Sequence, residues 1–301
     1  MPQDSKNQIP QLAIKLQGGI GNQLFQQCFA EYLSQGCDLT LAYLVDGFSK
    51  DPYGRKNIVK RLLPNAIFLN QKDLVLSSCR LLNESVLQGT LDPVLLKALL
   101  SSQGIGTCIL EGYWQDLRYI SQQQIRSIKK SINDLKDRSS IMDYCDFQKK
   151  ILESKNSIAV HVRRHDYKHH GICEEMYYID SLNMIKNNFK DTNIFVFSDE
   201  PNYSDHFLRN AGFQTTITGC GDDLLDLLLI AQCKIHVIAN STYSWWGAML
   251  SESICTIYPK PWSLVHQPST TMFPVNWHAI EGAVQGGISK ITFLNQFHLQ
   301  R

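Results

Sequence analysis

The stretch Ser157–Tyr167, SIAVHVRRHDY, decides the fold that the sequence predicts. Its first half alternates β-branched residues with other side chains, which is the pattern of a strand. Two arginines, Arg163 and Arg164, follow at the carboxyl end, which is the ligand edge of an open α/β sheet. Arginine donates paired, charge-assisted hydrogen bonds to phosphate, although both arginines could instead form structural ion pairs. Because side chains alternate along a strand, we expect one arginine to face a ligand and the other a carboxylate.

Length, composition and charge narrow the class of protein. The chain has 301 residues, enough for two domains of ordinary size. With 44% hydrophobic and 19% charged residues, it has the composition of a soluble globular protein. Its formal net charge of +1 gives no reason to expect a nucleic-acid partner.

The cysteines and the apolar segments predict the cellular compartment of the protein. The 9 cysteines show no zinc-type pair spacing, so we expect reduced thiols and a cytoplasmic protein. No apolar run approaches the length that crosses a bilayer, so we expect no membrane span. The first ten residues, MPQDSKNQIP, lack the apolar core of a signal peptide.

A glycine-rich turn lies near the N-terminus. The sequence predicts a strand over residues 12–16, a turn that uses Gly18, Gly19 and Gly21, and a helix that ends near Gly36. The free N–H groups at the start of such a helix suit an anion. Leu24 stands where the dinucleotide fingerprint requires its third glycine, which argues against a nicotinamide or flavin site. Asn22 and Gln23 lie at the mouth of the turn, and an ordinary strand-to-helix turn is the alternative interpretation.

Polar and aromatic groups follow several other predicted strands. A strand from Ile109 leads into Tyr113, Trp114 and Gln115, and aromatic rings of this kind stack on sugars but also fill cores. The strand over residues 193–197 leads to Asp199, which could orient an arginine.

Two more polar features lie further along the chain. Asp226 lies inside an apolar helical run, and a buried carboxylate needs partners such as the N–H groups of guanine. The strand over residues 234–239 leads into hydroxyl groups and a new helix, which together form a natural phosphate cradle.

Strands that end in polar groups and alternate with helices predict an α/β fold. The arrangement is that of doubly wound sheets with a ligand along one edge. We expect two Rossmann-like domains facing a central cleft, one over residues 1–154 and the other over residues 155–301.

Six segments of the chain together resemble glycosyltransferase family 11, the α-1,2-fucosyltransferases. They are GGIGNQLFQQCFA (18–30), GYWQ (112–115), HVRRHDY (161–167), FVFSDE (195–200), ANSTYSWWGAML (239–250) and YPKPW (258–262). The HVRRHDY segment is also similar to one in α-1,6- and protein O-fucosyltransferases. The chain departs from the family pattern at His165, where glycine is usual, and at Gln27, where an aromatic residue is common.

The resemblance implies a GT-B-like fold and an inverting transfer of L-fucose from GDP-β-L-fucose. The acceptor would be a hydroxyl group, O2 of a terminal galactose in a glycan, and no metal or other cofactor would be required. In this scheme the N-terminal domain serves the acceptor and the C-terminal domain binds GDP-fucose.

Site roles follow from the resemblance residue by residue. Arg163 would bind the donor diphosphate, and Arg164 would support the site through Asp199. His161 and Asp226 would hold guanine. The remaining donor-binding candidates are Ser241, Thr242, Tyr243, Gly19, Gly21, Asn22 and Gln23, and the acceptor-binding candidates are Tyr113, Trp114 and Gln115.

The chemistry of the transfer is consistent with this set of residues. Negative charge develops on the β-phosphate as GDP departs, and fixed cations and N–H groups stabilise it. The sequence contains no Asp-x-Asp pair of the kind that holds a metal, so arginine would take that role. The acceptor hydroxyl must lose a proton to a base. Asp166 is the first candidate, and Glu174, Glu175 or an acid of the N-terminal domain are the others. A structural partnership of Asp166 with Arg163 or Arg164 is the alternative.

Three other functions remain open at this point. The first is transfer of another GDP-linked sugar. The second is a non-enzymatic nucleotide- or sugar-binding protein that uses four aromatic rings, those of Tyr113, Trp114, Trp245 and Trp246. The third is a nucleotide-binding oxidoreductase, which would need the complete glycine fingerprint.

Overall fold

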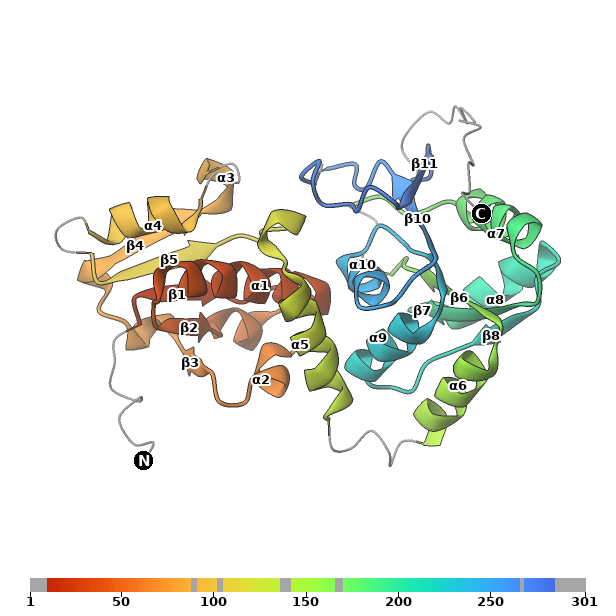
Figure 1. Cartoon of the computed structure of the whole chain (residues 1–301), viewed down its shortest axis with the longest axis horizontal. Helices are drawn as coiled ribbons and strands as arrows, with labels where there is room; N and C mark the ends of the chain where they lie inside the picture. The colour runs from red at the N-terminus through yellow and green to blue at the C-terminus, as the bar shows by residue number, and fades with distance from the viewer. Residues whose placement is uncertain are drawn as a thin grey trace. The chain divides into compact units, whose positions relative to one another are not determined.

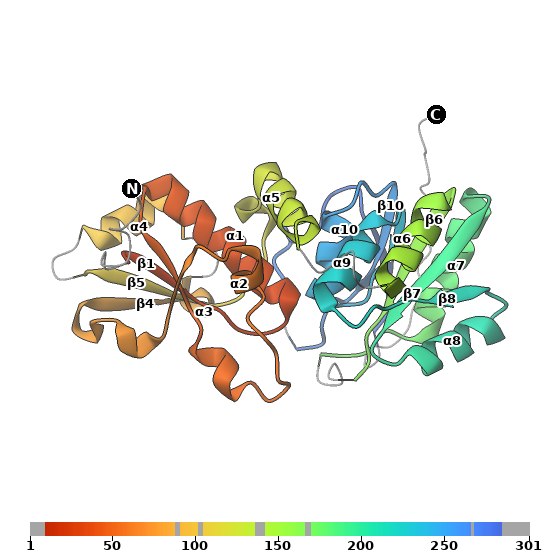
Figure 2. The same ribbon diagram turned by 90° about the horizontal axis from the view of Figure 1, so that it is seen from below.

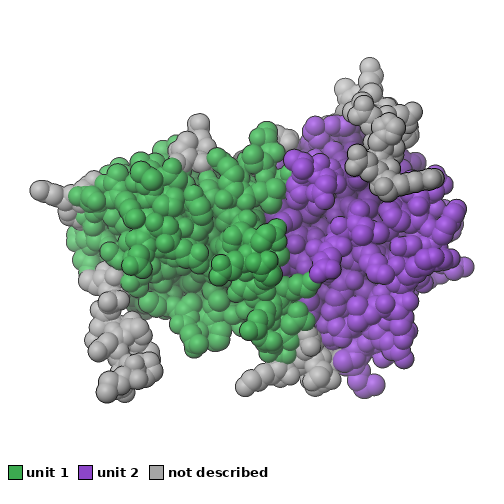
Figure 3. All heavy atoms as spheres, in the orientation of Figure 1, with its two compact units in different colours: residues 1–135, 269–273 green, residues 136–268, 274–301 purple. Residues whose placement is uncertain are grey.

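The computed structural model describes residues 10–87, 91–101, 105–135, 142–165, 170–265 and 268–284. The chain divides into two compact units, coloured separately in Figure 3. Unit 1 comprises residues 1–135 and 269–273, and unit 2 comprises residues 136–268 and 274–301. Each unit contains one sheet in which all the paired strands are parallel.

The division between the units falls earlier than the boundary at residue 154 that we expected. Helix α6 (Met142–Glu153) belongs to unit 2, where it packs against α9 (Asp223–Gln232). Tyr144 of α6 is buried, and its hydroxyl oxygen accepts a hydrogen bond from Nε2 of Gln232 at 3.3 Å. The apolar face of α6 is therefore covered by unit 2. The contact with Gln232, which is distant in the sequence, shows why a local pattern did not place this boundary.

Unit 1 has the strand order β3-β2-β1-β5-β4 (Figure 1). Its strands are β1 (Leu12–Lys15), β2 (Leu41–Leu44), β3 (Ile67–Leu69), β4 (Cys79–Asn83) and β5 (Thr107–Glu111). Its helices are α1 (Ile20–Cys37), α2 (Val59–Leu62), α3 (Glu84–Leu87), α4 (Pro93–Leu100) and α5 (Gln122–Asn133). Short 3-10 turns span Asp46–Lys50, Gln71–Asp73, Leu76–Ser78 and Leu117–Tyr119.

Helix α1 extends slightly past the glycine at which we expected it to end. The helix closes at Cys37, and Asp38 takes the left-handed conformation with φ of 57°. Gly36 is instead a packing position, because a Cβ atom there would lie 2.5 Å from Cγ of Pro93 in α4. The glycine thus allows two helices to approach closely and does not cap one of them.

Unit 2 has the strand order β11-β10-β9-β6-β7-β8, with β6 inside the sheet. Its strands are β6 (Asn156–Val162), β7 (Thr192–Ser198), β8 (Thr215–Ile217), β9 (Ile235–Val237), β10 (Cys255–Lys260) and β11 (His278–Glu281). Besides α6 and α9, its helices are α7 (Glu175–Asn188), α8 (Pro201–Asn210) and α10 (Thr242–Met249). None of the helices in the described ranges combines the length and apolar character that crossing a bilayer requires.

Helices cover both faces of the unit 2 sheet, as Figure 2 shows. Ile158, Val160 and Val162 of β6 share one hydrophobic core with residues of α7 and α8. On the other face, the ring of His161 lies 5.5 Å from that of Tyr243 in α10. Successive side chains of β6 therefore face different helix layers, as strand geometry requires.

A close helix contact supports the face that carries His161. Gly247 of α10 packs directly on α9, where a Cβ atom at this position would lie 2.3 Å from Cγ2 of Ile230. Such a separation is well inside van der Waals contact, so only glycine fits without movement. The contact fixes how α9 and α10, which both begin at the carboxyl edge, lie against each other.

Replacing Gly247 tests the closeness of this contact. Gly247→Ala should lower the free energy of unfolding by about 1–3 kcal/mol, because an extra methyl group overpacks the core. Chemical denaturation of the single variants and of the double variant with Ile230→Ala measures the coupling. If the clash is with Ile230, the double variant should be more stable than the sum of the two single losses predicts. Strict additivity would contradict the assignment.

Candidate active site

Asp199 anchors the carboxyl end of β6. Its carboxylate accepts hydrogen bonds from the backbone N–H groups of Arg164, at 3.1 and 3.3 Å, and of His165, at 3.0 Å. The same carboxylate lies 3.3 Å from Nε of Arg163. One acidic side chain at the end of β7 thus fixes both the backbone after β6 and the first arginine.

The side chain of Arg164 has different partners from those we expected. Its Nε donates to Oε2 of Glu200 at 3.2 Å, and its guanidinium lies 3.9 Å from the ring centre of Tyr203 in α8. We expected Asp199 to support Arg164, but Asp199 contacts only the Arg164 backbone and pairs with the Arg163 side chain. The alternation of side chains separates the two guanidinium groups, so the neighbouring acid Glu200 takes the second one.

His161 is the most unusual polar residue at this edge. It is 5% exposed, and its Nδ1 atom is buried without a hydrogen-bond partner among the described residues. Burial, together with the nearby positive charge of Arg163, lowers the pKa of His161 to about 3. The imidazole is therefore neutral near pH 7. A buried polar atom without a partner is costly, and a ligand could satisfy it.

Asp226 and Tyr243 lie on the same face as His161. Tyr243 donates its hydroxyl hydrogen to the backbone oxygen of Asp223 at 2.7 Å, which ties α10 to the start of α9. Oδ1 of Asp226 accepts from the backbone N–H of Cys220 at 2.8 Å. Burial raises the pKa of the Asp226 carboxyl group.

Ser241 and Thr242 begin helix α10 beside these residues. Ser241 is the N-cap, and its hydroxyl oxygen accepts from the backbone N–H of Tyr243 at 3.4 Å. Both residues are nearly buried at the carboxyl edge of β9. The N-terminus of a helix presents N–H groups and a positive dipole to an anion. Asp166, our candidate base, lies outside the described residues.

The glycine-rich turn of unit 1 forms as expected between β1 and α1. Gly18 has φ of +78°, a conformation that favours glycine, and a Cβ atom there would lie 2.7 Å from the Asn22 side chain. Gly19 is the N-cap of α1, and no atom comes within 4 Å of the position its Cβ would take. Gly21 lies in the first turn of α1 and is buried.

Three amide side chains of α1 hold the loops at this edge of unit 1. Asn22 accepts a hydrogen bond from Nε2 of Gln115 at 3.0 Å. Gln23 is fully buried, and its amide bonds to the backbone of Gly18, Lys56 and Ile58. Gln26, which sequence reasoning missed, bridges the backbone of Gln17 and Gly112. We expected Gln23 to contact the donor, but its amide is committed to positioning loops.

The aromatic segment after β5 divides into an exposed and a buried residue. Tyr113 is 41% exposed, whereas Trp114 is 1% exposed and stacks on Phe29 with ring centres 4.1 Å apart. The carboxylate of Glu84 accepts from the backbone N–H groups of both, at 2.7 and 2.9 Å. We expected both residues to contact an acceptor, but the ring of Trp114 packs in the core and only Tyr113 presents a substantial surface.

Burial of the tryptophans weakens the hypothesis of a non-enzymatic protein that binds sugars through aromatic rings. Trp245 and Trp246 are fully buried, as Trp114 is nearly so. Of the four rings that this alternative required, only that of Tyr113 presents a substantial surface.

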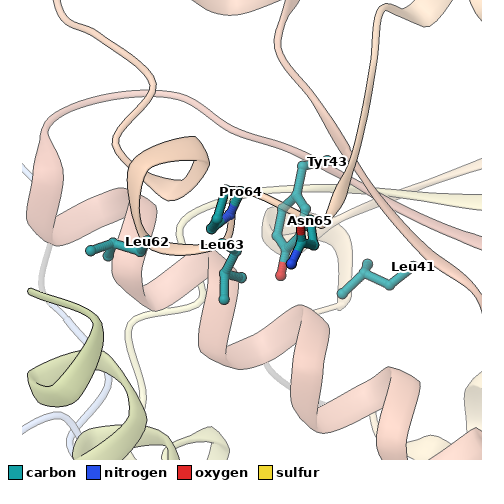
Figure 4. A pocket seen from close by; sticks show the side chains of 7 residues that line it. Leu41, Tyr43, Leu62, Leu63, Pro64 and Asn65 are labelled. Carbon is teal, nitrogen blue, oxygen red and sulfur yellow. The ribbon is translucent and has the colours of Figure 1, made fainter. Parts of the chain in front are cut away.

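Two cavities differ in their position and lining. One, of about 390 Å³, lies in unit 1 near the starts of β2 and β3, at the amino edge, and Figure 4 shows its mainly apolar side chains. The other, of about 320 Å³, lies in unit 2 at the carboxyl edge, beside Arg164 and Tyr203. Only the second lies at the edge where parallel sheets bind ligands. Within the described ranges, no three or more His, Cys, Asp or Glu side chains cluster to hold a metal ion.

Comparison with solved structures bears on the fold. A protein described as POFUT1 in complex with GDP-fucose aligns with 85% of this chain and 99% of its own, with a TM-score of 0.51 and 10% identity. This likeness confirms the predicted fold class, a GT-B-like α/β protein with two Rossmann-like domains.

Comparison of sequences bears on the family. An alpha-1,2-colitosyltransferase of Escherichia coli is 29% identical over 273 residues, which cover 82% of this chain and 91% of that protein. The O-antigen biosynthesis glycosyltransferase WbnK of Escherichia coli is 32% identical over 127 residues, which cover 38% of this chain and 42% of that protein. The model of the family described as "Glycosyl transferase family 11" matches residues 105–281, more than half of the chain. The chain therefore belongs to glycosyl transferase family 11.

Proposed function

We propose that this glycosyltransferase moves L-fucose from GDP-β-L-fucose to O2 of a terminal galactose, with inversion at the fucose anomeric carbon. The observation that carries the proposal is the buried Nδ1 atom of His161, which has no hydrogen-bond partner among the described residues and lies beside the Tyr243 ring and near the charge of Arg163. The base of a purine nucleoside diphosphate could form the missing hydrogen bond to this atom, and its phosphates could bind Arg163. Membership of family 11 supports sugar transfer as the reaction.

The guanine base would lie on the face that carries α9 and α10. A neutral His161 both donates and accepts a hydrogen bond, so it can bind a purine edge without adding charge. The Asp226 carboxylate accepts hydrogen bonds, and guanine offers adjacent N–H donors where adenine presents an acceptor. The raised pKa of Asp226 reflects the burial that such a ligand would compensate.

The diphosphate would lie where Arg163 and the start of α10 meet the carboxyl edge. Asp199 holds the Arg163 side chain, so the guanidinium is ordered before the donor arrives. As the bond to the sugar breaks, this cation and the N–H groups near Ser241 and Thr242 stabilise the charge on the β-phosphate. We propose that these groups suffice without a metal ion, and that Asp166 removes the proton from the acceptor hydroxyl.

Transfer of a colitosyl group is a second candidate. The observation that favours it is the similarity, over 273 residues, to an alpha-1,2-colitosyltransferase. Colitose lacks the 3-hydroxyl group of fucose, so the two donors share the nucleotide, the diphosphate and the 6-methyl group. The assay below includes both donors.

A transfer assay tests the function and the absence of a metal together. The protein, freed of metal and held in excess EDTA, should form an α-1,2-fucosylated product from GDP-fucose and a galactoside, with the linkage assigned by NMR. GDP-colitose and GDP-mannose serve as competing donors. Turnover that disappears in chelator and returns with manganese or magnesium would contradict metal independence. Faster transfer from GDP-colitose would favour the second candidate.

Substitutions at the two arginines test the role of Arg163. Arg163→Ala should lower turnover by about two to three orders of magnitude, as loss of one oxyanion donor does. Arg163→Lys should restore little activity, because one ammonium cannot reproduce the guanidinium fork. Arg164→Ala should instead lower thermal stability more strongly, since it leaves Glu200 without its partner. A folded Arg163→Ala enzyme with nearly full activity would exclude Arg163 from the donor site.

The pH dependence of stability tests the neutral state of His161. The ordinary pKa of 6.5 falls to about 3 on folding, so the unfolded chain binds the proton first as the pH falls. Stability is therefore lost as the pH falls from about 6.5 towards 3. His161→Phe should reduce that loss by about 1.4 kcal/mol per pH unit, measured by urea denaturation between pH 6 and 4. Equal slopes in the two proteins would show that the histidine is not buried in its neutral form.

A further inference from the structure

The cavity of about 320 Å³ in unit 2 lies beside the proposed diphosphate site. It is lined by Arg164 at the end of β6, by Glu174, Glu175 and Met176 at the start of α7, and by Tyr203 of α8. All five residues belong to one unit, and they lie on the face of the sheet opposite His161. Its volume falls in the range of small-molecule sites.

The charges around this cavity argue against a second anion. Arg164, the one cation among the described residues of the lining, is already held by Glu200 and by the Tyr203 ring. Two further carboxylates, Glu174 and Glu175, lie on the lining. Three acids around one arginine leave the surroundings negative, so a phosphate would be repelled. A neutral ligand with several hydroxyl groups suits the lining, because carboxylates accept strong hydrogen bonds from hydroxyls.

The side chains of Glu174 and Glu175 differ in their hydrogen bonds to the protein. Tyr203 donates its hydroxyl hydrogen to Oε1 of Glu175. Burial, and this hydrogen bond, raise the pKa of Tyr203 to about 12, so the phenol keeps its proton. Glu174 is the N-cap residue of α7, yet its side chain makes no capping hydrogen bond to the helix. Both carboxylates therefore retain acceptor positions for a ligand.

Met176 adds an apolar part to the same lining. This residue is 52% exposed although its side chain is large and hydrophobic. A ligand that carries a methyl group beside its hydroxyls would cover this thioether while using the carboxylates. A 6-deoxyhexose has this combination, because C6 is a methyl group and the ring carries hydroxyl groups.

The position of the cavity along β6 links it to the donor. Arg163, which faces the proposed diphosphate, and Arg164, which lines the cavity, are consecutive residues whose Cα atoms lie about 3.8 Å apart. A sugar attached to the β-phosphate is the next group after the phosphate. With the nucleotide on the His161 face, the sugar would pass over the end of β6 to the opposite face.

We propose that this cavity binds the 6-deoxyhexosyl ring of the donor, with Glu174 and Glu175 accepting hydrogen bonds from its hydroxyl groups and Met176 covering its methyl group. The inference rests on the proposed function, since it requires a GDP-linked deoxyhexose. An acceptor hexose has similar chemistry, so the experiment must separate the two sugars.

Calorimetric titration with GDP and with GDP-fucose tests the inference. Glu174→Gln and Glu175→Gln should each weaken GDP-fucose binding by about five- to tenfold, the loss expected when a charged hydrogen-bond acceptor becomes neutral. The affinity for GDP should stay within about twofold, because GDP lacks the sugar. Tyr203→Phe, which keeps the ring over Arg164 but frees Glu175, should weaken GDP-fucose in the same direction. Glu153→Gln, on the exposed surface of α6, is the matched control.

The possible outcomes separate this inference from the proposed function. Failure of the unaltered protein to bind GDP would overturn the proposed function, and the sugar site with it. Equal losses for GDP and GDP-fucose, or no loss for either, would overturn the sugar site alone. Unchanged GDP-fucose affinity with a raised KM for the galactoside would assign the cavity to the acceptor and contradict the proposal. Thermal melting with saturating GDP confirms that each variant is folded.

Discussion

The candidate site depends on the carboxylate of Asp199 at the end of β7. It accepts from two backbone N–H groups after β6 and also lies against the Arg163 guanidinium. The chain leaving the sheet has no further strand partner there, so these contacts replace the missing ladder hydrogen bonds. The backbone direction at Arg164 sends the second guanidinium towards Glu200 and Tyr203. The Asp199 side chain thus helps to direct the Arg163 and Arg164 guanidinium groups to opposite faces of the sheet.

Much of the architecture follows from residue patterns, because alternation and glycine placement are local properties. The strand over Asn156–Val162, the turn at Gly18 and the helix of Thr242–Met249 each carry their signal within a few residues. Which acid meets which arginine is not local. Asp199 and Glu200 are adjacent and chemically alike, and only the exit angle of the chain after β6 distinguishes them. The placement of α6 on unit 2 similarly depends on a distant partner, Gln232.

Aromatic and amide residues were the least predictable part of the site. Trp114 and Gln23 have the chemistry of ligand contacts, and both are buried in unit 1. Trp114 fills the space beside Phe29, and Gln23 satisfies backbone groups that would otherwise be unpaired. A sequence shows that such a side chain has the chemistry to bind a ligand. It does not show whether the side chain instead packs in the core or forms hydrogen bonds within the protein. His161 is likewise buried, and its Nδ1 atom has no hydrogen-bond partner among the described residues.

The amides of helix α1 have a mechanical consequence. Asn22, Gln23 and Gln26 connect one helix to the turn before it, to the segment that contains Lys56 and Ile58, and to the segment after β5. The anchors are buried or half-buried, whereas Tyr53 and Tyr113 at the tips of these segments are exposed. Substitutions at these exposed tips therefore change the surface that unit 1 presents without removing the hydrogen bonds that space the segments. Helix α1 therefore serves as a rigid support that holds these segments at fixed positions.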